Sequence, residues 1–370
     1  MIVVSVLPND IIFSILLRLP VKSLTRFKTV SKSWNALITD SYFIRQHYSL
    51  LAQRQISSKL LLVERVVRGS THIYPTRLTF DKTSKNLLAH RNMYKPYKPY
   101  LSNGLDSLRC ILGPCFGVFC FGVYPNLEGT MRFTLCNIAT GEKKTIRTLS
   151  CKKNDRVVSC AFGFGCVDTT VNVLEFKIVR LSYLSTEDGD GLLKCVSHVY
   201  TFATDSWKIT EPCQSFTEEV ATEVDGIIYW LAKTPEEEKR LDKNNSFIVT
   251  FDLKKEVFGR IELPHGIHYR STLTKQDDKY LSLITHSNPS GGVINIWVMH
   301  GESWVMQARL GPSRIDSGMM LGYWHSTGGM LWDKDTGIVL IIGDNCYKCC
   351  SKISFTFGLL LDYVESLVSF

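Results

Sequence analysis

The chain has 370 residues, of which 45% are hydrophobic and 21% charged. This composition excludes a disordered or low-complexity protein, and the length is sufficient for one large domain or two smaller ones. The formal net charge is 43 − 35 = +8, which by itself favours a nucleic-acid or membrane partner.

The charge is distributed unevenly along the chain. Residues 1–50 carry six Lys/Arg and two Asp/Glu, a net +4, and residues 51–160 carry eighteen against six, a net +12. Residues 161–370 carry nineteen against twenty-seven, a net −8. We therefore expect basic and acidic parts of one fold, and a binding surface with a gradient of charge that orients its target.

No apolar run in the sequence has the roughly 18 residues of a membrane helix. The apolar start, MIVVSVL, is interrupted by Pro8, Asn9 and Asp10 before it reaches the length of a signal peptide. We therefore expect a cytoplasmic or nuclear protein without a membrane partner. In these reducing compartments the twelve cysteines are expected to be thiols.

The first element pattern predicts three short helices within residues 8–46. Pro8 and Pro20 suit the first positions of two of them, and the third is expected from about Ser31 to Ile38. One stripe of the first helix is apolar at Ile12, Ile15, Leu16 and Leu19, but Ile11, Phe13 and Leu17 make it apolar nearly all round. Either the rest of the chain or another protein must cover the second face.

After residue 60 the pattern changes to short β-rich runs separated by polar turns. One pattern recurs: a strand ends in a large residue, a polar turn follows, and a second large residue stands seven positions after the first. It occurs in YTFATDSW (Tyr200, Trp207), FDLKKEVF (Phe251, Phe258) and WVMHGESW (Trp297, Trp304). Two such aromatic residues can meet on one face of a hairpin. The recurrence at about fifty residues predicts a β-propeller-like domain of about six degenerate blades. The alternative, a β-sandwich, does not explain the regular spacing.

Motifs for metal binding and catalysis are incomplete. The spacing of Cys346, Cys349 and Cys350 resembles half of a zinc site, which distant ligands such as Cys151 or Cys160 would have to complete, and we favour buried or incidental thiols. His265 and His268 share one loop, and GESWV (301–305) lacks the second glycine of a nucleophile elbow. We expect no metal, no cofactor and no catalytic site.

Two polar stretches are candidates for ligand binding. HRNMYKPYKPY (90–100) interleaves basic and aromatic residues, which is typical of a nucleic-acid contact but also of a solvated loop between blades. We favour the loop. PEEEKRLDKNN (235–245) has an acidic run and is expected to be an exposed loop.

The segment LPNDIIFSILLRLPVKSLTRFKTVSKSWNALITDSYFIRQH (7–47) closely resembles the plant form of the F-box. Later stretches resemble the F-box-associated domain of plant F-box proteins, and they include GPCFGVFCFG (113–122), VYTFATDSW (199–207), VDGIIYWLA (224–232) and INIWVMHGESW (294–304). The end DYVESLVSF (362–370) is similar to that of S-locus F-box-like members.

The resemblance implies an F-box of three short helices in residues 1–48, a connecting segment in 49–60 and a propeller-like substrate-binding domain in 61–370. In this family the F-box docks a Skp-type adaptor, which links it to cullin and RING subunits of an SCF-type ubiquitin ligase. The β domain captures a protein substrate for ubiquitination and proteasomal degradation, and the chain itself is non-catalytic. The alternatives are a protein-interaction propeller outside any ligase and a nucleic-acid-binding propeller, which we disfavour.

The resemblance also implies site residues. The adaptor-facing positions are expected at Leu7, Pro8, Ile11, Ile15, Leu16, Leu19, Pro20, Val21 and Leu24, with Trp34 anchoring the third helix at the core or the edge of the interface. Basic residues nearby, Lys22, Arg26, Lys28 and Lys32, suit an acidic partner. Substrate contacts are expected at Tyr94, Tyr97, Lys98, Glu236, Glu237 and Glu238. The substrate is unidentified, and an S-locus ribonuclease is one hypothesis.

Overall fold

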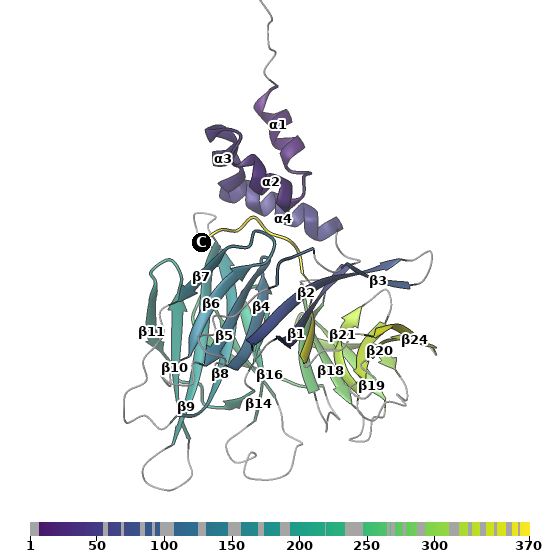
Figure 1. Cartoon of the computed structure of the whole chain (residues 1–370). Coiled ribbons are helices and arrows are strands. Elements are labelled where there is room, and N and C mark those ends of the chain that lie inside the picture. The colour runs from purple at the N-terminus through teal and green to yellow at the C-terminus, as the bar shows by residue number, and fades with distance from the viewer. Residues whose placement is uncertain are drawn as a thin grey trace, which may run out of the picture.

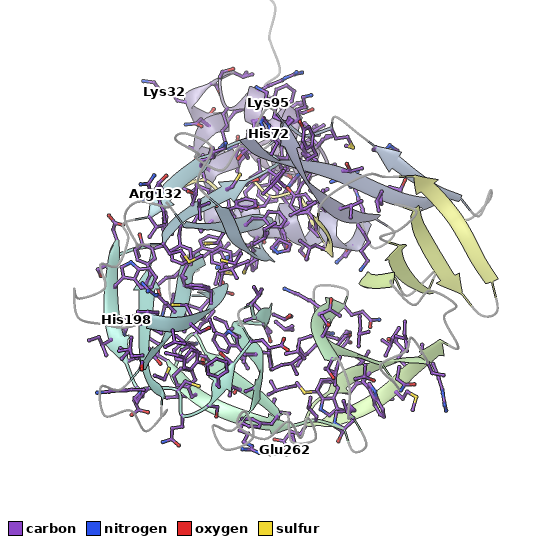
Figure 2. All side chains as sticks on the ribbon, turned by 60° about the horizontal axis from the view of Figure 1, so that its bottom comes forward. Lys32, His72, Lys95, Arg132, His198 and Glu262 are labelled. Carbon is purple, nitrogen blue, oxygen red and sulfur yellow. The ribbon has the colours of Figure 1, made fainter. Side chains whose placement is uncertain are left out.

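A computed structural model gives the architecture of the chain (Figure 1). The backbone is described for residues 7–54, 58–67, 70–81, 86–90, 93–96, 107–124, 131–146, 157–168, 174–185, 193–218, 220–233, 247–264, 267, 271–276, 279–286, 293–310, 318–324, 328–333, 338–343, 346–352, 357–361 and 363–370. Side chains are described for most of these residues up to 309, and again from 361.

The helical module contains the three predicted helices and a fourth. Their bounds are α1 (Asn9–Leu16), α2 (Val21–Phe27), α3 (Lys32–Thr39) and α4 (Ser41–Arg54). Helix α4 was not predicted, and it runs through residue 48, where the helical domain was expected to end, to Arg54. Asp40 begins it, because Oδ1 accepts hydrogen bonds from the backbone N–H groups of Tyr42 and Phe43 at 3.0 and 3.1 Å. Neither proline nor glycine interrupts the following residues.

The β domain has six sheets in the described residues, which confirms the predicted number of blades. From the inner strand outward, blade A is β25 (Phe357–Leu361), β1 (Ser58–Val67), β2 (Ser70–Asp81) and β3 (Asn86–His90). Blade B is β4 (Ser107–Cys115), β5 (Val118–Tyr124), β6 (Arg132–Asn137) and β7 (Lys143–Ile146). Blade C is β8 (Val157–Asp168), β9 (Leu174–Ser185), β10 (Leu193–Thr201) and β11 (Ser206–Thr210).

The acidic half of the chain completes the ring. Blade D is β12 (Phe216–Thr217) and β13 (Thr222–Val224), both paired with β14 (Ile227–Lys233), then β15 (Phe247–Asp252) and β16 (Val257–Glu262). Blade E is β17 (Ser271–Gln276), β18 (Tyr280–His286), β19 (Ile294–His300) and β20 (Ser303–Leu310). Blade F is β21 (Gly318–Trp324), β22 (Gly328–Asp333), β23 (Ile338–Gly343) and β24 (Cys346–Lys352).

The inner strands meet around the centre of the ring. Strand β8 contacts both β4 and β13, β17 contacts β13 and β21, and β21 contacts β25. The ring is closed within blade A, where β25 pairs antiparallel with β1 and Leu361 lies opposite Leu60. The strongly basic residues 51–160 therefore build blades A and B, apart from β25, and the acidic residues 161–370 build the remaining blades.

Two of the three predicted aromatic hairpins have the expected register. Tyr200 lies directly opposite Trp207, with ring centroids 5.3 Å apart, and Phe251 lies opposite Phe258 at 4.8 Å. In the third hairpin Trp304 lies opposite Met299 instead of Trp297. The length of the turn accounts for the difference, because this hairpin has a turn of two residues, 301–302, where the other two have four.

The helical module lies at one end of the blades (Figure 1). Its core includes Val364 and Leu367 from the last described segment of the chain, Tyr363–Phe370, which we call the closing segment. The ring of Tyr48 on α4 stacks on Phe116 in the β4–β5 turn at 4.6 Å, and Arg45 forms an ion pair with Asp168 at the end of β8. The module therefore packs directly on blades B and C.

Candidate protein-binding surface

An exposed apolar row runs along α1. Ile11 and Ile15 are one turn apart, so they lie on the same side of α1, and Leu7 precedes the first helical residue by two positions. The side chains of Leu7, Ile11 and Ile15 are 55%, 43% and 49% exposed. We call these three side chains the α1 row. Single exposed apolar residues are common on protein surfaces, but a contiguous row of large ones indicates a binding site.

Local sequence fixes the helix that carries the row. The carbonyl oxygen of Pro8 accepts hydrogen bonds from the backbone N–H groups of Ile11 and Ile12, both at 3.1 Å. Pro20 begins α2 in the same way, and Ser31 begins α3 by accepting a side-chain hydrogen bond from the Trp34 N–H at 3.1 Å. Three short helices are thus bounded by residues that the sequence provides at the right spacing.

The opposite side of the module is closed by the chain itself. Leu16, Val21 and Leu24 are at most 1% exposed and pack with α3, α4 and the closing segment. The expectation that these three side chains face an adaptor is therefore corrected: they form the core that holds the helices together. Burying each one contributes about 1.5–3 kcal/mol to folding.

The remaining predicted positions lie at or near the surface. Pro8 and Pro20 are exposed, and Leu19 and Trp34 are half-buried. Trp34 packs edge-on against Phe27 at 5.5 Å, which fits the role of an anchor for α3. Val30 and Tyr42, which were not predicted, are also exposed apolar residues of this module. The sequence did not indicate their exposure, because neither residue belongs to the apolar stripe of α1.

The module's surface is basic. Arg18, Lys22, Arg26 and Lys32 are exposed, and Asp10 and Asp40 are the acidic residues of the described helices. Charges of one sign beside an apolar row speed the encounter with a partner of the opposite sign. The arrangement fits an acidic protein partner.

A buried histidine joins α4 to the end of α1. His47 Nε2 donates a hydrogen bond to the carbonyl oxygen of Leu19 at 2.8 Å, and its Nδ1 has no hydrogen-bond partner. Burial lowers the pKa of His47, although the bond to Leu19 and the charge of Glu365 act in the opposite direction. Burial therefore favours the neutral imidazole in the folded module.

The predicted substrate contacts fare differently. Tyr94 is buried, and its hydroxyl donates to Glu365 at 2.8 Å and accepts from Arg77 at 2.5 Å, so the expectation of a substrate contact there is corrected. Burial and the nearby Glu365 carboxylate raise its pKa. Tyr97, Lys98, Glu236, Glu237 and Glu238 lie outside the described residues.

No arrangement for metal binding occurs in the described part of the chain, where no three His, Cys, Asp or Glu side chains are grouped to hold an ion. The side chains of Cys346, Cys349 and Cys350, and all of Cys151, His265 and His268, lie outside it. Cys110, Cys115 and Cys120 are buried thiols, as expected. None of the helices among the described residues has the length and apolar content needed to cross a membrane.

Comparison with protein families matches both parts of the chain. Residues 4–46 match the F-box domain, and residues 114–370 match the F-box associated beta propeller domain. An F-box implies binding to a Skp-type adaptor, and proteins that combine these two domains are typically substrate receptors and generally non-catalytic.

Relatives come from Arabidopsis thaliana. The F-box/kelch-repeat protein At3g17530 is 28% identical over 71% of this chain and 62% of its own length. The putative F-box protein At3g10430 is 31% identical over 70% of this chain and 61% of its own length. The chain thus spans less than two thirds of these two relatives.

Among solved structures, YjhT is similar over 66% of this chain and 83% of its own, with 8% identity and a TM-score of 0.39. This distant similarity says nothing about ligand or function. The two family matches leave residues 47–113 between them, and they occur in the same order as the helical module and the six-bladed ring in the structure. The chain belongs to the plant F-box proteins that carry an F-box-associated β-propeller domain.

Proposed function

We propose that this protein is the substrate receptor of an SCF-type ubiquitin ligase. The α1 row docks a Skp-type adaptor, which brings the cullin and RING subunits, and the propeller captures a protein that is then ubiquitinated and degraded. The observation that carries the proposal is the exposed row Leu7, Ile11 and Ile15 at and before a helix whose Leu16 is buried in the core of the module.

The geometry supports a separation of adaptor docking from substrate capture. Asp168, at the end of β8, pairs with Arg45 of α4, and the Asp225–Gly226 turn lies beside the same end of β8 next to Val167. Strand β14 runs from this turn across the blade to Lys233, so Lys233 lies on the side of the ring opposite the helical module. We call this side the far face. A substrate bound on the far face leaves the α1 row free.

The acidic run Glu236–Glu238 follows Lys233 in the sequence, and we propose that it contributes to capture on the far face. Blades A and B are built from the basic segment and blade D from the acidic one. A target with charge of both signs would then bind in one orientation.

A pull-down with a Skp-type adaptor tests the docking step. We expect wild type to retain the adaptor and the double variant Ile11→Asp/Ile15→Asp to lose it, because two charges would be buried without partners in the interface. The matched control is Val158→Asp/Ile209→Asp, which places two carboxylates on exposed apolar positions of the propeller. Equal retention by all three proteins would contradict the proposal.

The same variants address the second candidate, a binding protein that acts outside a ligase. Proteins captured by wild type while the proteasome is blocked should also be captured by Ile11→Asp/Ile15→Asp, and only wild type should shorten their half-life. Unchanged half-lives with wild type would favour the non-ligase function.

Reversal of Glu236, Glu237 and Glu238 to Lys should weaken substrate capture at low salt, and unchanged capture would exclude this run from the substrate-binding surface. Binding of nucleic acid with a steep salt dependence would instead favour the third candidate.

A further inference from the structure

The closing segment is buried between the helical module and the ring. Within it, Tyr363, Val364, Ser366, Leu367 and Val368 are all at most 8% exposed. It has no regular secondary structure, so its backbone groups need partners from other elements. A short irregular segment buried to this degree has a large number of fixed contacts.

Successive side chains of the segment enter different apolar clusters. Tyr363 stacks on Phe119 of β5 at 5.7 Å, within the cluster that blade A shares with blade B. Val364 and Leu367 enter the core of the helical module, and Val368 enters the cluster between blades B and C. The segment therefore connects the module to three neighbouring blades at once.

Asn137, at the end of β6, holds the backbone of the segment. Its Nδ2 donates to the carbonyl oxygens of Ser366 and Val368, both at 2.9 Å, and the side chain is fully buried. Its Oδ1 accepts from the N–H of Ala139 at 3.0 Å, within its own turn. One buried amide thus joins the segment to blade B.

Glu365 provides a second attachment. Its carboxylate accepts hydrogen bonds from Arg77 of β2 and from the hydroxyl of Tyr94, both at 2.8 Å. The Arg77 and Glu365 side chains are only 14% and 12% exposed. Charge-assisted hydrogen bonds that are shielded from water are stronger and more directional than surface ion pairs.

Gly117, in the β4–β5 turn, has room for the segment only because it lacks a side chain. A Cβ atom on Gly117 would lie 2.7 Å from both the Ser366 Cβ and the Val364 carbonyl oxygen. Gly141, in the β6–β7 turn of the same blade, has a similar positive φ, +79° against +71°, but nothing lies within 4 Å of its Cβ position. The two glycines differ in their contact with the segment, not in their backbone conformation.

We propose that the closing segment fixes the orientation of the helical module on the propeller, so that the α1 row and the far face move as one rigid body. Val364 and Leu367 are the positioning residues on the module, and Asn137, Glu365 and the space at Gly117 hold them in place. If the proposed function holds, a captured substrate is then held at one distance and one angle from the ligase. This consequence rests on the proposed function.

The test compares two matched pairs of variants in the full chain. Gly117→Ala and Gly141→Ala both place a side chain at a positive φ, +71° and +79°, but only Gly117→Ala introduces a Cβ atom that clashes with the closing segment. Leu367→Ala and Leu283→Ala remove the same atoms from buried positions, but Leu283 lies in blade E, away from the segment. The second pair carries the test if Gly117→Ala fails to fold.

The measured quantity is the distribution of distances between labels at Lys32 of α3 and Ile209 of β11, both exposed positions on the two bodies. Genetically encoded labels leave the twelve cysteines untouched. We expect one narrow distribution for wild type, Gly141→Ala and Leu283→Ala, and a broader or shifted one for Gly117→Ala and Leu367→Ala. Narrow, unshifted distributions in the folded Leu367→Ala and Gly117→Ala proteins would overturn the inference.

A second readout addresses the functional consequence. In a reconstituted ligase the lysines of this chain that become ubiquitinated should form a restricted set in wild type and Leu283→Ala, and a wider set in Leu367→Ala. An equal set in all three would contradict the positioning role. The distance measurement requires no adaptor, so it decides the inference even if wild type fails to retain the adaptor and the proposed function fails.

Discussion

The two apolar sides of the helical module have similar side chains and different surroundings. On one side Leu16, Val21 and Leu24 are covered by α3, α4 and the closing segment. On the other side Ile11 and Ile15, which lie on α1 together with Leu16, remain about half exposed. The comparison teaches that hydrophobicity alone does not identify a binding surface, whereas the apolar area left uncovered by the complete chain does.

The largest expected effect is on the covered side. Leu24→Ala should destabilise the module by about 2–5 kcal/mol, because a fully buried leucine leaves a cavity among tightly packed neighbours. Hydrogen exchange of the amides in α2 and α4 measures this local loss. Unchanged protection in Leu24→Ala would mean that this side is not the core of the module.

The exposed side should show the reverse behaviour. Ile11→Ala/Ile15→Ala should lower the affinity for a Skp-type adaptor by roughly tenfold or more, since truncating a buried anchor at an interface commonly costs about 1–2 kcal/mol or more. Its thermal stability should stay within about 0.5 kcal/mol of wild type, as for other surface substitutions. Titration calorimetry and thermal unfolding measure the two quantities. A loss of stability equal to that of Leu24→Ala would remove the contrast between the sides.

The covered side should also respond to pH through His47. Since the pKa of His47 is lowered in the folded state, the unfolded chain binds the proton more readily. The resulting stability is fully present above the unfolded pKa of about 6.5 and is lost as the pH falls below it, by at most about 1.4 kcal/mol per pH unit.

The matched variant for this prediction is His47→Gln, whose amide can donate to the Leu19 carbonyl but does not titrate. Urea unfolding at pH 7.5 and pH 5.5 should show a smaller loss for His47→Gln than for wild type. The same loss in both proteins would assign the pH dependence to other groups. The α1 row contains no titratable side chain, so adaptor binding should not follow this titration.

The smallest effect is expected at the solvent-exposed ion pair between the module and blade C. Asp168→Asn removes the negative partner of Arg45, but the Asp168 side chain is 61% exposed, and exposed ion pairs contribute about 1 kcal/mol or less. The change in stability should shrink further in high salt. A loss as large as that of Leu24→Ala would show that this ion pair, rather than the apolar core, attaches the module to blade C.

Much of the architecture could be predicted because it repeats locally. Prolines mark the start of the first two helices and Ser31 that of the third, and cross-strand pairs such as Tyr200 and Trp207 recur with the spacing of a blade. Helix α4 was missed because half of its sequence, SYFIRQHYSLLAQR, is polar, and its buried face of Phe43, His47, Tyr48 and Leu51 includes a histidine that interrupts the apolar stripe. The pairing of Trp297 with Trp304 was wrong because the spacing of two aromatic residues does not reveal the length of the turn between them.

The site was predicted only in part, because its division into core and surface depends on contacts between distant parts of the sequence. A helix that is apolar nearly all round does not reveal whether Leu16 or Ile15 is covered, and the covering residues Val364 and Leu367 come about 350 positions later. Tyr94 was wrongly expected to bind substrate because the residues that bury it are also distant in the sequence. Its partners Arg77 and Glu365 belong to blade A and to the closing segment, and composition does not indicate that they meet.

The pairing of β1 with β25 has a consequence for how the protein is made. Leu60 and Leu361 are 301 positions apart, and at about 5–20 residues per second the ribosome needs roughly 15–60 seconds to deliver the partner of the first strand. During that time the ring is open, one edge of β1 is unpaired, and the helices have neither Val364 nor Leu367. Nascent and prematurely terminated chains therefore expose an adhesive strand edge and apolar surface, which makes them natural clients for chaperones and for degradation.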